Sequence, residues 1–497
     1  MKSLEKMVLL LLLCIMAACG TQEKETLPVY QSIDDLKGKN VGTLTGCFQE
    51  EYLEKEHPEL KVMRIDMDAD MVQALLAKRC EAIVMDEHIY LYQKIKGVTF
   101  LEKPLITAEM GFCFGKGKNT ELREQFNEYL KKIKEDGTYD EIYNRWMYHA
   151  DEAEIPEIQI PEDNNPIRIA TSSTAPPLVF MKDGKLTGHD IELATRFAAS
   201  IGRRIVWSDM NFSAMLPALV SGNQDMAVAG INITPERQKS IDFSDPYFIC
   251  NSIIVVRSEN SEGFVDESND SEKIGFLESV KIGFQRNIIE EDRYLMILNG
   301  LKLSALIALF AGLFGTLLGA LICWMRMSSY AVLRQFAGIY ISLMRGTPIL
   351  VMLMIMFYVV FAGTSIDAVT VSIITFGMNF AAYVSEMFRS SIENIDKGQT
   401  EAGIALGFTP AKTFFHIVMP QAFKQVLPVY KGELISLVKM TSIVGYIAVQ
   451  DLTKVGDIIR SRTFDAFFPL IMVAALYFIL AWMFAVALDF IGKKANR

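Results

Sequence analysis

The stretch EAGIALGFTPAKTFFHIVMP, Glu401 to Pro420, lies between apolar segments but is polar enough to leave a lipid bilayer. Its pattern predicts a short helix, a turn at Gly407 and a second short helix. Thr409 is suited to cap the second helix, and Pro410 suits its first position because that position needs no backbone N–H donor. Pro420 is expected to end the unit. The stretch therefore predicts a helical hairpin attached to a membrane domain.

Apolar residues gather in the second half of the chain. Hydrophobic residues make up 51% of the 497 residues and the mean hydropathy is +0.23, which is too apolar for a wholly soluble protein. Residues 20 to 290 are charged and mostly acidic, whereas residues 299 to 492 resemble membrane segments. Each of five apolar stretches approaches the roughly 20 residues with which a helix crosses a bilayer. Transmembrane helices are expected near 300–324, 340–363, 368–388, 426–449 and 467–491.

Basic residues are distributed unequally over the connections between these stretches. Because basic residues favour the cytoplasmic side, the connections that are rich in them are expected inside the cell. The Glu401 hairpin is then cytoplasmic, and residues 20 to 290 lie outside. The basic set comprises Arg326, Arg334, Arg345, Arg389, Lys397, Lys412, Lys424, Lys493, Lys494 and Arg497, whereas the opposite set holds mainly Lys454, Arg460 and Arg462.

The N-terminus has the pattern of an export signal. Lys2 and Lys6 precede the apolar run Met7–Ala18, which is too short to span a membrane comfortably. The run ends in Ala17-Ala18-Cys19-Gly20, which resembles a bacterial lipoprotein cleavage site, so Cys19 is expected to become a lipidated first residue. A plain secretory signal with a chance cysteine is the alternative.

Two α/β blocks follow the signal. In the first, short apolar strands alternate with helices, which implies a mostly parallel sheet covered by helices. The first block closes with a helical pair near 122–147, which is expected to pack onto the second block. The expected divisions are a signal peptide at 1–19, a tether at 20–28, the blocks at 29–150 and 166–257, a Pro-punctuated linker at 151–165, a connector with an amphipathic approach to the membrane at 258–294, and a membrane domain at 295–497.

Two phrases carry a family resemblance in the second block, GHDIELA at Gly188–Ala194 and AVAGINITPERQKSIDFSDPYF at Ala227–Phe248. With them the block resembles the first lobe of the extracytoplasmic solute-binding proteins for polar amino acids. Residues 29–150 resemble the second lobe with its C-terminal helices. The resemblance implies one two-lobed α/β periplasmic-binding-protein domain, circularly permuted, that closes like a hinge. The alternative is two incomplete modules, each with half of a cleft.

The resemblance also implies an amino-acid site that both blocks build. A free amino acid presents a carboxylate and an ammonium, and a fixed guanidinium and a fixed carboxylate match them. By the family match, Arg237 binds the α-carboxylate with help from Gly230 and Asn232, while Asp86 binds the α-ammonium. Further contacts fall on Thr45, Gly46, Phe212 and Ser172.

Ordinary structural roles stay open for the same positions. Arg237 also suits a surface helix, Asp86 also suits a helix cap, and Phe212 also suits a hydrophobic core. The chain departs from the family pattern at Leu44 and Ala175, where relatives carry a polar and an aromatic contact. The identity of the amino acid is therefore left open.

The hairpin carries a second resemblance. The spacing E-A-x-x-x-x-G, then ten residues to an Ile and a Pro, resembles the coupling loop of bacterial ABC importer permeases. In that family the loop docks into a groove of a separate ATPase. Gly403 stands where a second Ala is usual, and the alternative is an ordinary amphipathic hairpin. The residues that carry this role by resemblance are Glu401, Ala402, Gly407, Ile417 and Pro420.

Several classes of chemistry find no support. The chain has no G-x-x-x-x-G-K-[ST] phosphate loop and no catalytic Ser/His/Asp or Cys/His set, so it is expected not to be an enzyme and to need no cofactor. Its net charge of −10 gives no support to nucleic-acid binding. The seven cysteines are scattered singly, which indicates neither a metal site nor a disulfide framework.

The sequence thus predicts a membrane subunit of an ATP-driven amino-acid importer, in which a fused binding domain feeds an all-α permease of five transmembrane helices. The expected partners are an amino acid, two copies of a cytoplasmic ABC ATPase and a second copy of the chain, because five spans supply half of a pathway. The expected location is the bacterial inner membrane. One alternative is a ligand-gated ion channel with glutamate-receptor-like lobes, and another is a sensor, although no signalling segment is present.

Overall fold

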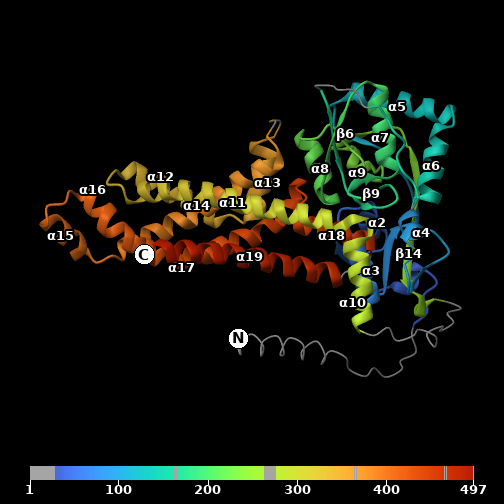
Figure 1. The fold of residues 1–497 in the computed structure, drawn as a ribbon. Helices are drawn as coiled ribbons and strands as arrows, with labels where there is room; N and C mark the ends of the chain where they lie inside the picture. The colour runs from blue at the N-terminus through green and yellow to red at the C-terminus, as the bar shows by residue number, and fades with distance from the viewer. Residues whose placement is uncertain are drawn as a thin grey trace.

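Two α/β lobes and an elongated helical domain make up the molecule, and the lobes sit at one end of the helical domain (Figure 1). The structure is a computed structural model. It describes residues 28–495 except 94, 151, 160–164, 262–275, 363, 365, 464 and 466. The predicted signal peptide, Cys19 and the tether up to residue 27 lie outside the described residues.

Lobe A, residues 28–110 and 248–261, is built around a six-stranded sheet. Strand β1 pairs in parallel with β2 and β3, but β14 is antiparallel to β3, β4 and β5. The expectation of a mostly parallel sheet is wrong here, because a long strand from the second block enters in the opposite direction. In sheet order the strands are β2 (Lys61–Ile65), β1 (Asn40–Leu44), β3 (Ala82–Asp86), β14 (Phe248–Arg257) and β4 (Val98–Phe100), with β5 (Ile106–Met110) beside β14; the helices are α2 (Phe48–Glu56), α3 (Asp68–Leu76) and α4 (Glu87–Gln93).

Lobe B, residues 111–247, has a five-stranded sheet and a smaller three-stranded one. The helices α5 (Thr120–Glu135) and α6 (Thr138–His149) pack on the second block as predicted. Phe126 stacks on Phe112 with ring centroids 4.5 Å apart, and the buried Trp146 donates to Glu192 at 2.7 Å. The other elements are β11 (Ile205–Asp209), β7 (Ile167–Thr171), β12 (Met226–Ala227), β6 (Cys113–Gly115) and β13 (Ile241–Phe243) in the larger sheet, β10 (Lys185–Thr187), β9 (Val179–Lys182) and β8 (Thr174–Ala175) in the smaller, and helices α7 (His189–Ser200), α8 (Phe212–Ser221) and α9 (Pro235–Gln238).

Lobe A is assembled from two separate stretches of chain, and lobe B is formed by the stretch between them. The chain crosses between lobes after β5 and again after β13, so β14 joins lobe A although the second block was expected to form one lobe up to residue 257. The two ends of lobe A meet: Tyr30 N–H donates to the Asn260 carbonyl at 2.9 Å, and the Asn260 amide donates to the Pro28 carbonyl at 2.7 Å. Adjacent ends are what a domain with rearranged chain order requires.

Among the described residues, the helical domain contains three helices that are long and apolar enough to cross a membrane, and two bent helix pairs that raise the total to five if each pair is one span. The second predicted span is one of these pairs, because α12 and α13 meet at 107° at the phrase Arg345–Pro348. The helices of the helical domain are α10 (Phe276–Phe284), α11 (Arg293–Met327), α12 (Ala331–Gly346), α13 (Ile349–Ile355), α14 (Ala368–Glu393), α15 (Lys397–Ala405), α16 (Pro410–Thr413), α17 (Met419–Met440), α18 (Leu452–Thr463) and α19 (Phe467–Ala495).

The hairpin of α15 and α16 lies at the far end of this domain from the lobes (Figure 1). Gly407 makes the predicted turn with φ +85°, and the Thr409 side chain accepts from Lys412 N–H as the predicted cap. The expectation that Pro420 ends the unit is wrong, since Pro420 lies in the first turn of α17. A π-helical turn at Phe414–Val418 precedes it, and such a turn shifts the hydrogen-bond register ahead of a residue that has no N–H to donate.

Candidate functional site

The cleft between the lobes is lined by residues from both. Five of the predicted ligand residues contribute to this lining: Asp86 from lobe A, and Ser172, Phe212, Gly230 and Asn232 from lobe B. Leu44 and Ala175, the two departures from the family pattern, also line the cleft. The sequence analysis missed several other lining residues, among them Cys47, Gln49, Asp68, Met71 and Thr174.

Arg237 joins the two lobes beside this cleft. Its backbone is held at the start of α9, where the Thr234 hydroxyl accepts from Arg237 N–H at 3.2 Å. The guanidinium donates to the carbonyls of Asn232 in lobe B and Gly46 in lobe A, both at 2.9 Å. It also lies 6.0 Å from the centre of the Phe212 ring. Burial lowers the pKa of Arg237 below its usual value.

Thr45 and Gly46 are placed differently from their expected role as donors to a carboxylate. The N–H of Thr45 donates to the Ile65 carbonyl at 2.8 Å, and the N–H of Gly46 donates to Glu50 at 2.6 Å. Neither residue is among the lining residues of the cleft. Their backbone donors are used inside lobe A, and the contact that Gly46 makes with the site is its carbonyl, which accepts from Arg237.

Asp86 ends strand β3 and is held by neutral donors. Gln49 Nε2 donates to its Oδ1 at 2.5 Å, and Ser252 Oγ donates to the same oxygen at 3.4 Å. Burial raises the pKa of Asp86 to about 6. Asp68, at the start of α3, is also buried in the cleft, and burial raises its pKa to about 7, with the charge of Asp86 adding to the effect. Two carboxyl groups therefore share a site that is poor in water.

Gly230 and Asn232 are positioned from behind by lobe B. The N–H of Gly230 donates at 3.0 Å to Asp190, which also accepts from the Tyr247 hydroxyl at 2.7 Å. Gly230 has φ +62°, and a Cβ there would lie 2.7 Å from Leu178 Cδ1, so a larger residue would strain the backbone and require Leu178 to move. Asn232 is 4% exposed, and its Nδ2 has no hydrogen-bond partner among the described residues. A buried amide donor at the edge of a cleft is a group that an anionic ligand would satisfy.

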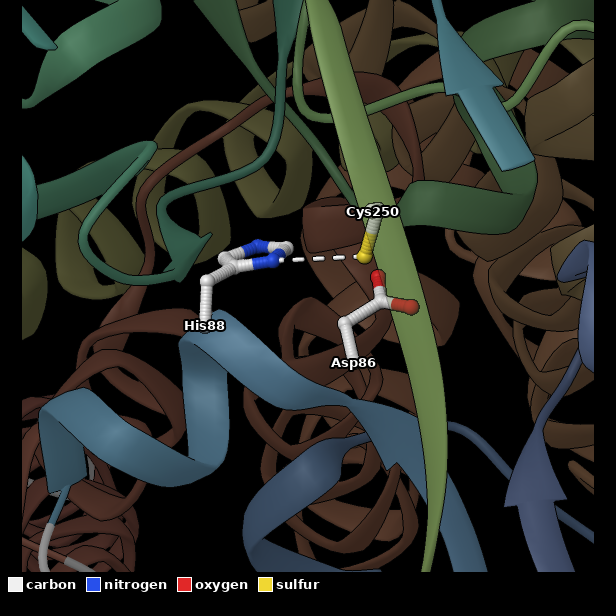
Figure 2. A group of neighbouring side chains, drawn as sticks. All are labelled: Asp86, His88 and Cys250. Carbon is white, nitrogen blue, oxygen red and sulfur yellow. Dashed lines mark hydrogen bonds between the residues drawn. The ribbon is translucent and has the colours of Figure 1, made fainter. Parts of the chain in front are cut away.

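Asp86, His88 and Cys250 form a cluster of the residue types that bind metal ions (Figure 2). One ligand atom each from Asp86, His88 and Cys250 lies within 4.8 Å of the others, and His88 Nδ1 is 3.4 Å from Cys250 Sγ. Burial lowers the pKa of His88 to about 3 and raises that of Cys250. Cys250 Sγ also donates to the Asn251 carbonyl at 3.3 Å. Cys250 also hydrogen-bonds to the Asp86 carboxyl, so the cluster supports Asp86.

The hairpin presents most of its predicted coupling residues to the surface. Glu401, Ala402, Gly407 and Pro420 are exposed, and Ile417 is half-buried. Large apolar side chains are exposed on the same unit, namely Ile404, Leu406, Phe408 and Phe415. Such a cluster on a protein surface marks an interaction site.

Gly403 is the buried point of the hairpin. A Cβ there would lie 2.6 Å from Thr413 Cγ2 and 2.9 Å from Ile417 Cδ1, so α15 approaches the second half of the hairpin too closely for Ala. This close approach gives the departure at Gly403 a physical reason.

Comparison with known proteins identifies the chain. Residues 42–149 and 167–425 match the model of the bacterial extracellular solute-binding proteins, family 3. The chain belongs to this family. The gap between the two matched stretches coincides with the linker between α6 and β7.

This family 3 protein also has permease relatives. It is 36% identical over 199 residues to the probable amino-acid ABC transporter permease protein YckA of Bacillus subtilis (strain 168), covering 40% of this chain and 88% of YckA. It is 34% identical over 203 residues to the arginine transport system permease protein ArtQ of the same organism, covering 40% of this chain and 91% of ArtQ. A solved structure described as an amino acid ABC transporter with histidines is 33% identical, with a TM-score of 0.39, covering 45% of this chain and all of that one. One polypeptide thus unites a solute-binding domain with an ABC transporter permease, and these relatives lend no support to an ion channel.

Proposed function

We propose that this chain is the membrane subunit of an ATP-driven importer that captures an amino acid in the cleft between lobes A and B and passes it to its own permease domain. The observation that carries the proposal is that Asp86 lines the cleft while Arg237, from a distant part of the sequence, lies close enough for its charge to act on Asp86 and bonds to lobe A through the Gly46 carbonyl. A carboxylate in the cleft and a guanidinium beside it match the two charges of a free amino acid.

Each predicted residue receives a role in this proposal. Arg237 and the buried Asn232 amide bind the α-carboxylate, with the Gly230 backbone held in place beside them. Asp86 binds the α-ammonium, Phe212 covers the ligand and Ser172 contacts its side chain. Thr45 and Gly46 shape the rim of the lobe A wall and take part through the Gly46 carbonyl.

The names of relatives suggest ligands to test first. They include systems for arginine, glutamine and L-cystine. The test is a thermal-shift and calorimetric screen of the purified full-length chain with the common L-amino acids and L-cystine. Asp86→Ala and Arg237→Ala are each expected to weaken binding by roughly 2–5 kcal/mol, because each leaves one charge of the ligand unpaired in a closed site. Glu236→Ala, an exposed neighbour on α9, is the matched control and is expected to bind normally.

The exposed hairpin supports an ATPase partner as part of the proposal. We assign Glu401, Ala402, Gly407, Ile417 and Pro420 to the docking of two cytoplasmic ABC ATPase copies. Glu401→Lys is expected to leave amino-acid binding intact and to abolish ATP-coupled uptake in vesicles that contain the ATPase. Uptake at the wild-type rate by this variant would remove the coupling assignment.

The location is proposed from the two ends of the molecule. The binding lobes and the hairpin lie at opposite ends of the helical domain (Figure 1), as expected if the lobes are extracytoplasmic and the hairpin is cytoplasmic. We place the chain in the bacterial cytoplasmic membrane, with Cys19 as a lipid anchor. We further propose that two chains pair around a two-fold axis.

A further inference from the structure

The permease domain touches the binding domain through helix α18 and the loop before it. Lys454 on α18 is 2% exposed, and its Nζ donates to Asn211 Oδ1 at 3.2 Å. The same Nζ lies 3.9 Å from Asp209 Oδ1, and Gln450 Nε2 donates to Asp209 Oδ2 at 3.1 Å. Asp209 is itself 6% exposed. A lysine of the permease is therefore buried against a carboxylate and an amide of lobe B.

The two lobe B residues that Lys454 contacts stand directly behind the ligand cleft. Asp209 accepts from the Ser173 N–H at 2.9 Å and from the Ser173 hydroxyl at 2.6 Å. Ser173 lies between Ser172 and Thr174, which both line the cleft. The hydroxyls of Ser172 and Thr174, on either side of Ser173 in the sequence, are hydrogen-bonded to each other at 3.1 Å.

The second contact reaches another part of the same wall. Asn211 is the N-cap residue of α8, and the next residue is Phe212, which lines the cleft. Two separate segments of the lobe B wall are thus fixed on their outer side by one ammonium group and one amide of the permease.

The chemistry of burial makes this link stiff. A buried ammonium needs a carboxylate or other oxygen partners, and a buried carboxylate with its charge uncompensated is equally unfavourable. Lys454, Asp209 and Asn211 consequently hold one another in one arrangement. This arrangement fixes the Ser172–Thr174 segment through the two hydrogen bonds from Ser173 to Asp209, and it fixes Phe212 because Phe212 directly follows Asn211 in the chain.

We propose that Lys454 of the permease domain is a positioning residue for the amino-acid site, which sets ligand affinity from the permease side by fixing the Ser172–Thr174 segment and Phe212 through Asp209 and Asn211. The proposal rests on the proposed function of the cleft. It requires that affinity for the amino acid depends on a residue that lies outside the binding domain. Because coupling between two sites is reciprocal, occupation of the cleft in turn biases the contact at α18.

The test measures amino-acid binding to the full-length chain in lipid nanodiscs, with L-arginine, L-glutamine and L-cystine as probes. Lys454→Met removes the charge at similar length and is expected to raise Kd about tenfold, within the range of typical site-to-site coupling. Lys454→Arg keeps the charge and is expected to restore most of the affinity. In uptake assays with the ATPase, Lys454→Met is expected to raise KM for the probe and to leave the maximal rate nearly unchanged.

Asn223→Ala is the matched docking control. Asn223 Nδ2 donates to the Phe357 carbonyl of the permease at 3.0 Å, and the residue does not line the cleft. This variant is expected to keep the wild-type Kd. If it weakens binding as much as Lys454→Met does, Lys454 acts by general docking and the positioning role is overturned.

Other outcomes are equally decisive. An unchanged Kd in folded Lys454→Met overturns the proposal. If Lys454→Met does not fold, Gln450→Leu replaces it, since loss of its bond to Asp209 is expected to raise Kd in the same direction, and an unchanged Kd there overturns the proposal. If the wild-type chain binds neither the probes nor any common L-amino acid, the proposed function of the cleft fails as well.

Discussion

Asp68 and Asp86 lie together in the cleft, and burial raises the pKa values of both carboxyl groups, to about 7 and about 6. Midway between these two values the pair holds about one negative charge. A single ligand ammonium would be matched by that charge, whereas two full charges would oppose each other at short range.

Amino-acid binding is expected to weaken as the pH falls from 7 to 5. Protonation of Asp86 below its pKa of about 6 removes the charge that faces the ligand ammonium. The Kd should then rise roughly tenfold for each pH unit below that value. Titration calorimetry between pH 5 and 8 measures this, with Asp86→Asn as the comparison, which should bind weakly with little pH dependence. A wild-type Kd that stays constant across the range contradicts the assigned role of Asp86.

Asp68→Asn is expected to stabilise the ligand-free chain at pH 8. The native carboxyl keeps its proton up to a pKa of about 7, whereas the unfolded carboxyl loses it near 3.8, so the native state binds more protons between these values. The free energy of unfolding therefore falls as pH rises from about 4 to 7, and the neutral amide avoids that loss. A gain of roughly 2–4 kcal/mol at pH 8 is expected.

Thermal unfolding at pH 5 and pH 8 checks this effect. The difference between the two pH values should shrink in Asp68→Asn. Asp183→Asn, a change at an exposed turn, should keep the wild-type pH dependence. Equal behaviour of the two variants would mean that Asp68 is charged in the native state.

Of the two carboxyl groups, the sequence predicted Asp86 as a cleft residue but not Asp68. Asp86, Ser172, Phe212, Gly230 and Asn232 belong to phrases with a family pattern, and all five line the cleft. Asp68 carries no such pattern: an acidic residue in the first turn of a helix is ordinary. Its role depends on tertiary burial, which the sequence does not encode locally.

At the level of elements, the hairpin depends on a close approach at Gly403. Gly403→Ala would place a methyl group 2.6 Å from Thr413 Cγ2 and force α15 away from α16. Overpacking of this kind costs about 1–3 kcal/mol. The variant is expected to bind amino acids normally and to lose most amino-acid-stimulated ATP hydrolysis with the partner ATPase.

Gly432→Ala is the control for this change, because a Cβ at Gly432 on α17 meets nothing within 4 Å. It should leave ATP hydrolysis unchanged. If both variants hydrolyse ATP at the wild-type rate, the packing at Gly403 is not needed for coupling.

Elements with strong local signals were predicted well, and those set by distant pairing were not. The helical pair expected near 122–147 is found as α5 (Thr120–Glu135) and α6 (Thr138–His149), with their apolar faces packed in lobe B. Strand β14 was assigned to the wrong lobe, since its apolar sequence is compatible with either sheet and only pairing with β3, β4 and β5 decides it. Pro420 was misjudged because the preceding π-helical turn has no sequence signature.

On the scale of the whole molecule, the pairing of two chains is the next prediction. The purified chain is expected to have a protein mass of about twice 55.9 kDa by light scattering in detergent, because one set of up to five spans supplies half of a two-fold pathway. Co-expression of two differently tagged copies should yield complexes that carry both tags. A monomeric mass in complexes that are active in uptake would contradict pairing.

The order of lobes in the chain was predictable, and their division was not. Phrases typical of the two lobes appear in reversed order in the sequence, which indicated permutation. The crossings after β5 and β13 could not be located, because they are short and have no sequence pattern of their own.

The hydrogen bonds that join Pro28 and Tyr30 to Asn260 have a mechanical consequence. The chain enters and leaves the domain at one corner of lobe A. A mechanical force applied between residues 28 and 261 is therefore expected to act on that corner before it reaches the cleft. The first bond expected to break under such a force is the hydrogen bond between Tyr30 and Asn260, while the ligand is still bound.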